Sequence, residues 1–292
     1  MITTLLSQLL LPISLAIIML GMGMALVPDD FARVFKFPKA VLIGLTNQLI
    51  FLPIIGFLLA ISFGLNSTMA TGLMILSVCP GGPTSNLITQ VCKGNIALSI
   101  TMTAFASFAS MLTIPFILSY ALQYFDIGTN IEVKLPIADT ILQIMVITVI
   151  PISLGMVIRH FKPAFSKRME RPMRIASTVI FVLVFVAIFA VNLNLLGDAL
   201  REVGLVTLVL NLVTMSLGFL TARLFQQDLK NSISITIESG IQNGTLAVVV
   251  ATTIFHSFEM GIPAAIYSIW MFATGGFAMW YFGRRKEKPV NV

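Results

Sequence analysis

The chain has 292 residues, of which 57% are hydrophobic and 10% are charged, and its mean hydropathy is +0.98. This composition excludes an ordinary soluble globular domain and predicts an integral membrane protein. The formal net charge of +6 comes from cations in the loops between apolar segments, so it indicates membrane orientation. The lipid bilayer is therefore the expected partner, and the charge gives no reason to expect nucleic acid.

Nine apolar segments are long enough to cross a bilayer as helices. They lie near residues 4–26, 39–64, 69–92, 95–121, 135–158, 174–197, 203–226, 229–255 and 262–283. Without strict alternation of polar and apolar residues, they do not resemble the strands of an outer-membrane barrel. The predicted fold class is thus an all-α polytopic membrane protein with nine transmembrane helices and short loops. The first segment has no basic region or cleavage signature and is expected to be a retained span.

The basic residues predict the orientation of the chain in the cell (inner) membrane. Of the 18 Lys and Arg residues, 16 fall in the loops after predicted spans 1, 3, 5 and 7 or in the C-terminal tail. Only Lys134 and Arg201 fall on the other side. Because cytoplasmic loops carry an excess of cations, we expect the N-terminus outside and the C-terminus in the cytoplasm of a multi-pass protein.

The second, third and fourth predicted spans carry polar groups at membrane depth. Gln48 lies within the second span, and the third contains CPGGPTSN at residues 79–86 between apolar flanks. Non-helical backbone survives in a bilayer only inside protein or along a wet cavity, so this break predicts a binding site. On the fourth span, Ser99, Thr103 and Ser107 recur every four residues and share one helix face.

The eighth span is interrupted in a similar way, in TIESGIQNGTLAVVV. Each break is preceded by a matching pentapeptide, GFLLA at 56–60 and GFLTA at 218–222. If spans 1–4 correspond to spans 6–9, the odd offset places two repeats in opposite orientations, with span 5 as the connector. We therefore expect two inverted repeats whose broken helices cross near the membrane centre. The alternative for each break is a simple kink caused by proline or glycine.

Glu238 is the acidic residue that lies within a predicted span core. An ionised carboxylate at that depth is costly unless it is compensated, so it is a candidate functional group. No Lys or Arg falls within a span core by these boundaries, which leaves a metal cation or a proton as the compensating charge. A neutral structural Glu bonded to amides is the alternative. Nearby oxygen-bearing side chains suit a hard cation; they are Ser85, Asn86, Gln242 and Asn243.

These motifs resemble the bile acid:sodium symporter family, including its bacterial members. The resemblance covers nearly the whole chain, from GMGMAL at 21–26, and is carried by CPGGPTSN, by GNIALS at 94–99 and by ESGIQN at 238–243. It implies a single transporter domain over residues 1–292 that is not an enzyme and that carries a small organic anion, a carboxylate or a bile-acid-like molecule, with sodium by alternating access. It also implies a panel subdomain, approximately residues 1–38 and 135–200, and a core subdomain, approximately residues 39–134 and 201–292.

The same resemblance implies two sodium sites and a substrate site. The first sodium site would use Ser85, Asn86, Ser99, Thr103 and Glu238. The second would use Gln48, Glu238 and Gln242 with the backbone carbonyls of Ser239 and Ile241. The substrate would contact Asn243 and the half-helix that starts near Thr84. Pro83, which removes a backbone N–H from that helix start, and Met271 depart from the pattern of some relatives.

Other mechanisms and classes stay open at this point. Glu238 could carry a proton in a proton-coupled transporter, or the chain could transport an organic anion without coupling. An intramembrane enzyme is not favoured, because no second intramembrane carboxylate, HExxH or GxSxG motif is visible. A receptor or scaffold would give no reason for two breaks around one carboxylate.

Overall fold

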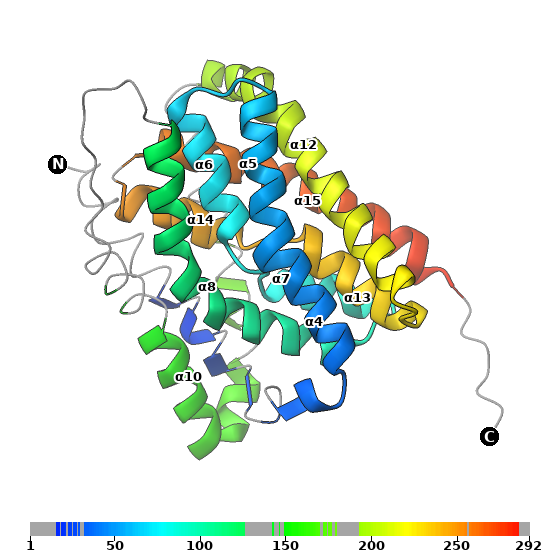
Figure 1. Ribbon diagram of the computed structural model, residues 1–292. Helices are drawn as coiled ribbons and strands as arrows, with labels where there is room; N and C mark the ends of the chain where they lie inside the picture. The colour runs from blue at the N-terminus through cyan, green and yellow to red at the C-terminus, as the bar shows by residue number, and fades with distance from the viewer. Residues whose placement is uncertain are drawn as a thin grey trace.

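The structure is a computed structural model (Figure 1). It describes residues 32–125, 149–169, 193–255 and 257–285, together with isolated positions between 16 and 29, between 142 and 146 and between 172 and 179. Every regular element within these ranges is a helix, which confirms the all-α class. The predicted spans at 4–26 and 174–197 lie largely outside the described residues, as do half of the span at 135–158 and about half of the predicted panel subdomain.

The described helices follow one another along the chain. They are η2 (Arg33–Phe35), α4 (Pro38–Thr46), η3 (Asn47–Phe51), α5 (Leu52–Ser62), α6 (Ser67–Val78), α7 (Pro83–Val91), α8 (Ile96–Phe125), α10 (Ile150–Phe161), α12 (Leu193–Leu224), α13 (Leu229–Gly240), α14 (Gly244–Thr253), η5 (Glu259–Gly261) and α15 (Ile262–Gly283). Figure 1 shows α4 and α5 as one long rod beside α12, with α6 and α8 on its other side.

Three stretches of helix among the described residues are long and apolar enough to cross a membrane: Pro38–Ser62, Gly197–Leu224 and Glu259–Gly283. A fourth is obtained if the two halves of α8, which meet at an angle of 55°, form one span. Pro115 lies inside α8, and the bend falls about one turn before it, where a proline removes a helix hydrogen bond. Several apolar helices are thus present, and the count of nine spans stays a prediction.

One predicted loop differs from the structure. The boundary between the sixth and seventh predicted spans, at residues 198–202, lies inside the continuous helix α12. Asp198, Arg201 and Glu202 are exposed there. Charged side chains can reach water from an exposed turn without ending the helix. A cluster of charged residues is therefore not sufficient to predict a loop.

The rod formed by α4 and α5 contains one turn of π-helix, η3. Pro53 follows this turn at the start of α5. Because proline cannot donate the backbone hydrogen bond expected one turn earlier, a π turn re-pairs the backbone, as often occurs at functional sites. The turn carries Asn47 and Gln48, which are consecutive polar residues and are both buried.

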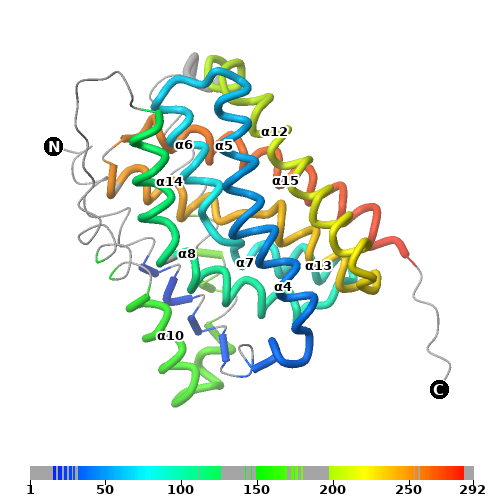
Figure 2. The backbone as a smooth tube through the Cα atoms, viewed as in Figure 1, coloured from blue at the N-terminus to red at the C-terminus, as the bar shows by residue number. Residues whose placement is uncertain are grey.

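Two helices are broken in the middle of the molecule. The first break, residues 79–82, separates α6 from α7, and the second, residues 241–243, separates α13 from α14. The breaks lie side by side, since Gly81 and Gln242 form an antiparallel β-bridge and the Asn243 N–H donates to the Pro80 carbonyl at 2.8 Å. Figure 2 shows these non-helical segments meeting in the centre. Every residue of both breaks is buried, as lipid requires of unpaired backbone.

The helices before the two breaks match in length and in their start. Both α6 and α13 contain 12 residues. The Asn66 side chain caps α6 by accepting the Met69 N–H, and the Asp228 side chain caps α13 by accepting the Asn231 N–H. Such caps fix the first residue of a helix. Each cap therefore sets the same helical length between the end of the molecule and its break.

The helices also pack in a matching way against their predecessors. A Cβ added to Gly56 of α5 would collide with Ser77 of α6, and one added to Gly218 of α12 would lie 2.7 Å from the Ser239 hydroxyl of α13. Gly56 is separated from Gly218 by the same number of residues as Ser77 from Ser239. The two sequence pentapeptides thus begin with the glycines that let each broken helix approach its neighbour closely.

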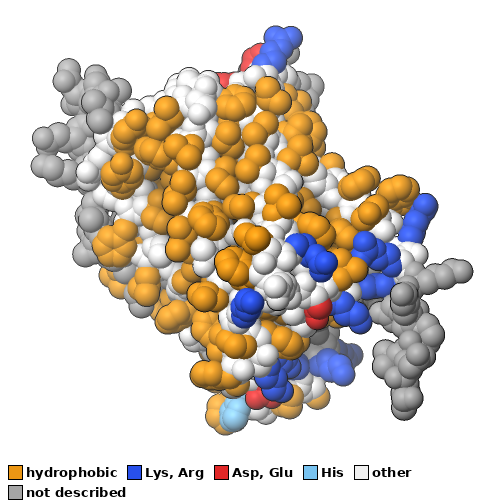
Figure 3. All heavy atoms as spheres, turned by 45° about the vertical axis from the view of Figure 1, so that its right-hand side comes forward, with side chains coloured by type: hydrophobic (Ala, Val, Ile, Leu, Met, Phe, Trp, Pro, Cys, Tyr) orange, Lys and Arg blue, Asp and Glu red, His pale blue; other side chains and the backbone are white. Residues whose placement is uncertain are grey.

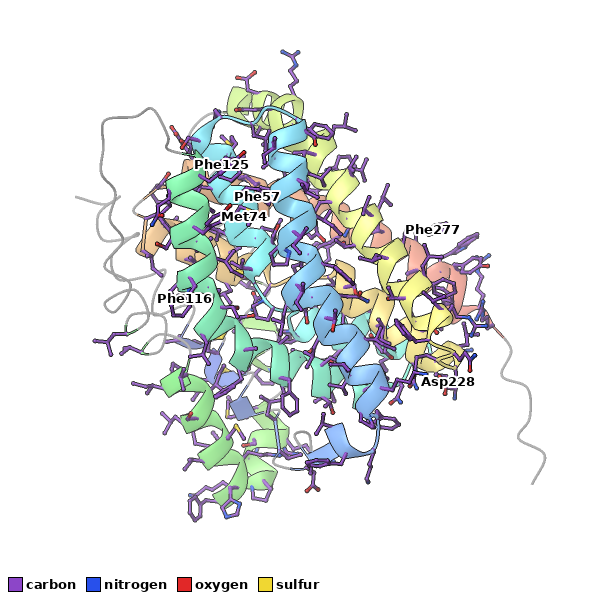
Figure 4. All side chains as sticks on the ribbon, in the orientation of Figure 1. Phe57, Met74, Phe116, Phe125, Asp228 and Phe277 are labelled. Atoms are coloured by element: carbon purple, nitrogen blue, oxygen red, sulfur yellow. The ribbon has the colours of Figure 1, made fainter. Side chains whose placement is uncertain are left out.

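Cations gather at one end of the molecule. Figure 1 places the starts of α4 and α13 and the ends of α12 and α15 at the same end; Lys39, Lys230, Arg223 and Arg284 lie there. Figure 3 shows Lys and Arg side chains concentrated at that end of the visible face, with an apolar belt between it and the opposite end. Figure 4 shows Asp228 at the cationic end and Phe125 and Phe57 at the other, where their ring centroids are 5.4 Å apart.

The described positions of the first and fifth predicted spans touch through glycine. A Cβ on Gly23 would collide with the Ile152 carbonyl at the start of α10, and one on Gly155 of α10 would lie 2.7 Å from the Met24 nitrogen. Backbones can approach this closely only where side chains are absent, as in close helix crossings inside membranes. These two segments therefore pack directly on each other.

Candidate ion and substrate site

Glu238 lies in the last turn of α13, beside both breaks, and only 1% of it is exposed. Its Oε1 accepts hydrogen bonds from the Ser85 hydroxyl of α7 at 2.6 Å and from the Ser99 hydroxyl of α8 at 2.5 Å. The Thr103 hydroxyl of α8 lies 3.1 and 3.0 Å from its two oxygens. Three hydroxyls from two other helices thus converge on one buried carboxylate.

The oxygens around Glu238 outnumber the protons that could pair them. The Ser99 hydroxyl has one proton, yet it also lies 2.8 Å from Asn86 Oδ1 and 3.3 Å from Thr89 Oγ1. The Ser85 hydroxyl also lies 2.7 Å from the Gly82 carbonyl. A buried cluster with surplus lone pairs has the donor chemistry that a hard cation requires.

A second group of polar atoms surrounds the backbone carbonyls of Glu238 and Ser239. The Gln48 amide nitrogen lies 3.2 Å from the Glu238 carbonyl and 3.4 Å from Gln242 Oε1. The Gln242 amide nitrogen donates to the Ser239 carbonyl at 2.9 Å. Gln48 Oε1 is buried without a hydrogen-bond partner. The π turn of η3 and the end of α13 thus bring two carboxamides to the same set of carbonyls.

Gly81 lies against both groups, because it has no side chain to keep its backbone away from them. An added Cβ would lie 2.6 Å from Glu238 Oε2, 3.1 Å from the Gln48 amide nitrogen and 3.5 Å from the Ile241 carbonyl oxygen. No other residue type fits without displacing one of these groups. The absent side chain therefore lets the backbone of the first break approach the carboxylate and the Ile241 carbonyl closely.

The helix ends around the carboxylate have opposite electrostatic character. Glu238 lies at the C-terminal end of α13, where the helix dipole is negative and a carboxylate is unfavourable. The starts of α7 and α14 point partial positive charge at the same region. Among the described residues, no Lys or Arg pairs with Glu238. A bound cation would offset both the buried charge and the helix dipole.

The predicted substrate residues lie at the starts of the two later half-helices. Asn243 is 7% exposed, and its Oδ1 caps α14 by accepting the Leu246 N–H at 3.0 Å. Its Nδ2 is buried without a partner. The Asn243 Cβ would lie 3.6 Å from a Cβ on Gly82, the N-cap of α7. An unpaired N–H donor therefore lies beside the helix start that contains half-buried Thr84.

The structure brings the predicted residues together, and it adds others. Hydrogen bonds or close approaches link all nine residues predicted for the two ion sites, whereas Ser107 of the predicted serine and threonine stripe has no such contact and is buried unpaired. Sequence reasoning missed Thr89, which a second stripe of hydroxyls on α7 would have suggested, and Gly81. The roles of all these residues in ion binding stay predictions.

Within the described ranges, no group of three or more His, Cys, Asp or Glu side chains could hold a metal ion. The oxygens at the site are one carboxylate with hydroxyl, amide and carbonyl groups. Such a set suits an alkali cation better than a transition metal, which prefers imidazole or thiolate ligands.

Apolar helices, paired breaks and a buried carboxylate lined by neutral oxygens define a membrane transporter rather than an enzyme. Residues 12–199 match the Sodium Bile acid symporter family. The chain belongs to this family of sodium-coupled membrane transporters.

Three relatives illustrate the range of the family. The chain is 30% identical to the sodium-dependent transporter YocS of Bacillus subtilis over 94% of this chain and 84% of that protein. It is 29% identical to the rabbit (Oryctolagus cuniculus) ileal sodium/bile acid cotransporter over 90% of this chain and 76% of that protein. It is 27% identical to "Probable sodium/metabolite cotransporter BASS2, chloroplastic" of Oryza sativa subsp. japonica over 97% of this chain and 65% of that protein.

Proposed function

We propose that the chain is a symporter that moves a small organic anion, a carboxylate or a bile-acid-like molecule, together with two sodium ions by alternating access. The observation that carries this proposal is the buried Glu238 carboxylate, which faces three hydroxyls and no cationic side chain among the described residues. The names of the relatives support sodium as the coupling ion. The substrate class rests on their names and on the site's charge.

The first proposed ion lies among the five residues around the carboxylate oxygens. These are Ser85, Asn86, Ser99, Thr103 and Glu238. The second proposed ion lies on the Gly81 side, where the Gln48 and Gln242 amides would turn their oxygens toward it. The carbonyls of Ser239 and Ile241 would complete its ligands, in agreement with the Ile241 oxygen, which would lie 3.5 Å from a Cβ on Gly81.

Charge balance links the ions to the substrate. Two sodium ions and one ionised Glu238 leave a net charge of +1 in a buried site, where an unpaired charge is costly. An anionic substrate would neutralise that charge. The unpaired Asn243 Nδ2 and the open start of α7, which includes Thr84, offer the N–H donors that an anionic group would accept.

Ion binding would connect four elements, because the proposed ligands belong to η3, α7, α8 and the α13 break. Ions can shift a conformational equilibrium only by binding one state more tightly than the other. We propose that the ions order these elements when the site faces outward, raise its affinity for the anion, and so couple the two gradients. Pro83 at the first position of α7 supplies no N–H, so substrate contacts would begin at Thr84.

The moving parts would be a panel, approximately residues 1–38 and 135–200, and a core, approximately residues 39–134 and 201–292. The close glycine contact between the first and fifth predicted spans supports grouping them in one panel. The matching caps and glycine contacts of α6 and α13 support two inverted repeats, spans 1–4 and 6–9, in a nine-span chain. The cationic end supports a cytoplasmic C-terminus and an outside N-terminus in the cell membrane.

Uptake into proteoliposomes tests this proposal, with radiolabelled pyruvate, pantoate and taurocholate as probes. An inward sodium gradient should stimulate uptake of at least one probe, and replacing sodium by choline at fixed pH should abolish the stimulation. Glu238→Gln should reduce stimulated uptake by about 100-fold or more, because a buried cation would lose its charged partner. The matched control is Glu259→Gln, which changes an exposed glutamate of η5.

Equal uptake in sodium and choline by the wild-type chain would contradict sodium coupling. If a proton gradient then drove uptake that Glu238→Gln abolished, Glu238 would be a proton carrier instead. Uptake that neither gradient stimulates would indicate an uncoupled transporter.

A further inference from the structure

A cluster of polar side chains lies next to the ion site but shares none of its proposed ligands. Asn211 of α12 and Tyr267 of α15 are fully buried, and Thr274 of α15 is half-buried. The Asn211 Nδ2 donates to the Gly240 carbonyl at 2.8 Å, and the Tyr267 hydroxyl donates to the same carbonyl at 2.9 Å. Two donors from two helices therefore hold one backbone oxygen.

Gly240 is the last residue of α13, where carbonyls have no partner within the helix. The Ile241 N–H closes the last turn on the Ile237 carbonyl at 2.8 Å. The carbonyls of the next three residues, Glu238, Ser239 and Gly240, need partners from elsewhere. The first two face the Gln48 and Gln242 amides, whereas the third faces α12 and α15. The carbonyls of consecutive residues are thus bonded by side chains from different segments of the chain.

The contacts of Asn211 fix the direction of its carboxamide. Its Nδ2 also lies 3.2 Å from the Tyr267 hydroxyl oxygen, and its Oδ1 lies 2.7 Å from the Thr274 hydroxyl. Turning the amide over would place its oxygen against the Gly240 carbonyl, and two acceptors cannot pair. The three side chains therefore act as one oriented unit.

Without these three side chains, few contacts would restrict the backbone at the end of α13. Gly240 has no side chain to restrict its backbone, and Ile241 already has extended dihedral angles. The missing Cβ has a second use, because one at Gly240 would collide with Met215 of α12. Glycine therefore lets α12 come close enough for Asn211 to reach the carbonyl, and the hydrogen bonds then restrict the freedom that glycine introduces.

We propose that Asn211, Tyr267 and Thr274 are positioning residues for the second sodium site. By holding the Gly240 carbonyl on the side of α12 and α15, they orient the carbonyls of Ser239 and Ile241 on either side of it toward the ion. This inference rests on the proposed sodium symport. A site with preoriented ligands binds more tightly because less freedom is lost on binding.

The test uses the purified full-length protein in detergent and measures its melting temperature as sodium chloride replaces potassium chloride at constant ionic strength. Tyr267→Phe removes the hydroxyl and keeps the buried ring. It should raise the sodium concentration at half-maximal stabilisation by about three- to tenfold, the effect of one lost hydrogen bond. The matched control is Ser268→Ala, since that buried neighbour donates only to Ala264 of its own helix; its sodium midpoint should equal the wild-type value.

A second pair of variants tests the orientation of Asn211. Thr274→Val keeps the shape of the side chain but removes the hydroxyl that faces Asn211 Oδ1, and it should raise the sodium midpoint in the same direction as Tyr267→Phe. Thr274→Ser restores the hydroxyl and should return the midpoint to the wild-type value.

The outcomes separate three cases. A wild-type protein that sodium does not stabilise would contradict the proposed function itself. A sodium response in the wild type with the same midpoint in Tyr267→Phe would overturn the positioning role, even if the variant melts at a lower temperature in potassium. A raised midpoint in Tyr267→Phe and Thr274→Val, absent from Ser268→Ala and Thr274→Ser, would establish it.

Discussion

The two helix breaks differ in how they are held, although the helices before them are equally long. The break between α6 and α7 begins at Cys79 and ends at Gly82, which gives α7 no side-chain cap. The break between α13 and α14 is held at both ends. Asn243 caps α14 with its own side chain, and two donors hold the carbonyl of Gly240.

This difference separates two kinds of ligand. The start of α7 has no side-chain cap, and its Thr84 N–H suits an anion that enters and leaves. The end of α13 bears the carboxylate and the carbonyls, whose spacing must be kept for ions with a small radius. An α13 end held rigidly for the ions and an uncapped α7 start for the anion are consistent with the proposed symport.

The largest expected effect comes from the point where the two breaks touch. Gly81→Ala should abolish sodium-dependent stabilisation and uptake, with a decrease of about 100-fold, because its Cβ would lie 2.6 Å from Glu238 Oε2 and occupy the space beside it. Gly82→Ala should be tolerated, since its Cβ would meet Asn243 at an ordinary 3.6 Å. The sodium midpoint of both variants checks this contrast, and an equal loss in both would contradict it.

A medium effect is expected at the matching glycines of the two repeats. Gly56→Ala and Gly218→Ala should each lower the free energy of unfolding by about 1–3 kcal/mol, because each Cβ crowds a serine of the neighbouring helix. Only Gly218→Ala should also raise the sodium midpoint, since Ser239 provides a proposed ion ligand and Ser77 does not.

Melting temperatures in potassium and in sodium measure both quantities for these glycine variants. An equal sodium midpoint in Gly56→Ala and Gly218→Ala would contradict the expectation that only the α13 break provides ion ligands next to the substituted glycine.

The smallest effect is expected at the helix caps. Asp228→Ala and Asn66→Ala should each destabilise the protein by about 1 kcal/mol through loss of an N-cap. The sodium midpoint should not change, because a 12-residue helix places each cap roughly 18 Å from its break. Asp228→Asn retains a capping oxygen and is the control. A shifted midpoint in Asp228→Ala would mean that α13 transmits changes along its length.

Much of the site could be predicted, because its main residues are polar or helix-breaking and yet lie inside apolar segments. Glu238 was found as a carboxylate inside an apolar segment, and residues 79–86 as helix breakers at membrane depth. The helices at both breaks confirm that the interruptions are more than kinks. The prediction of a loop at residues 198–202 was wrong. In the sequence, charged residues on an exposed helical turn cannot be distinguished from charged residues in a loop.

The positioning cluster was not predicted, although Asn211 is a carboxamide within an apolar span. Its partners, Tyr267 and Gly240, lie far from it in the sequence. An isolated polar residue in a span does not indicate which other helix it contacts. The π turn at Asn47 was also missed, because the pattern of Pro53 after an apolar run indicates a kink without specifying which backbone pairing replaces the lost bond.

By itself the sequence determined the solvent, the helical class, the distribution of charge and the presence of a lone intramembrane carboxylate. Each of these depends on composition or on the local order of residues, because exposing polar groups to a bilayer is costly and so restricts which segments can lie in it. The family resemblance already pointed to the hydroxyls around that carboxylate, whereas only the tertiary structure decided their distances and which carbonyl is turned away from it. Those choices depend on contacts between helices distant in the chain, where a single glycine or hydroxyl fixes the approach of one backbone to another.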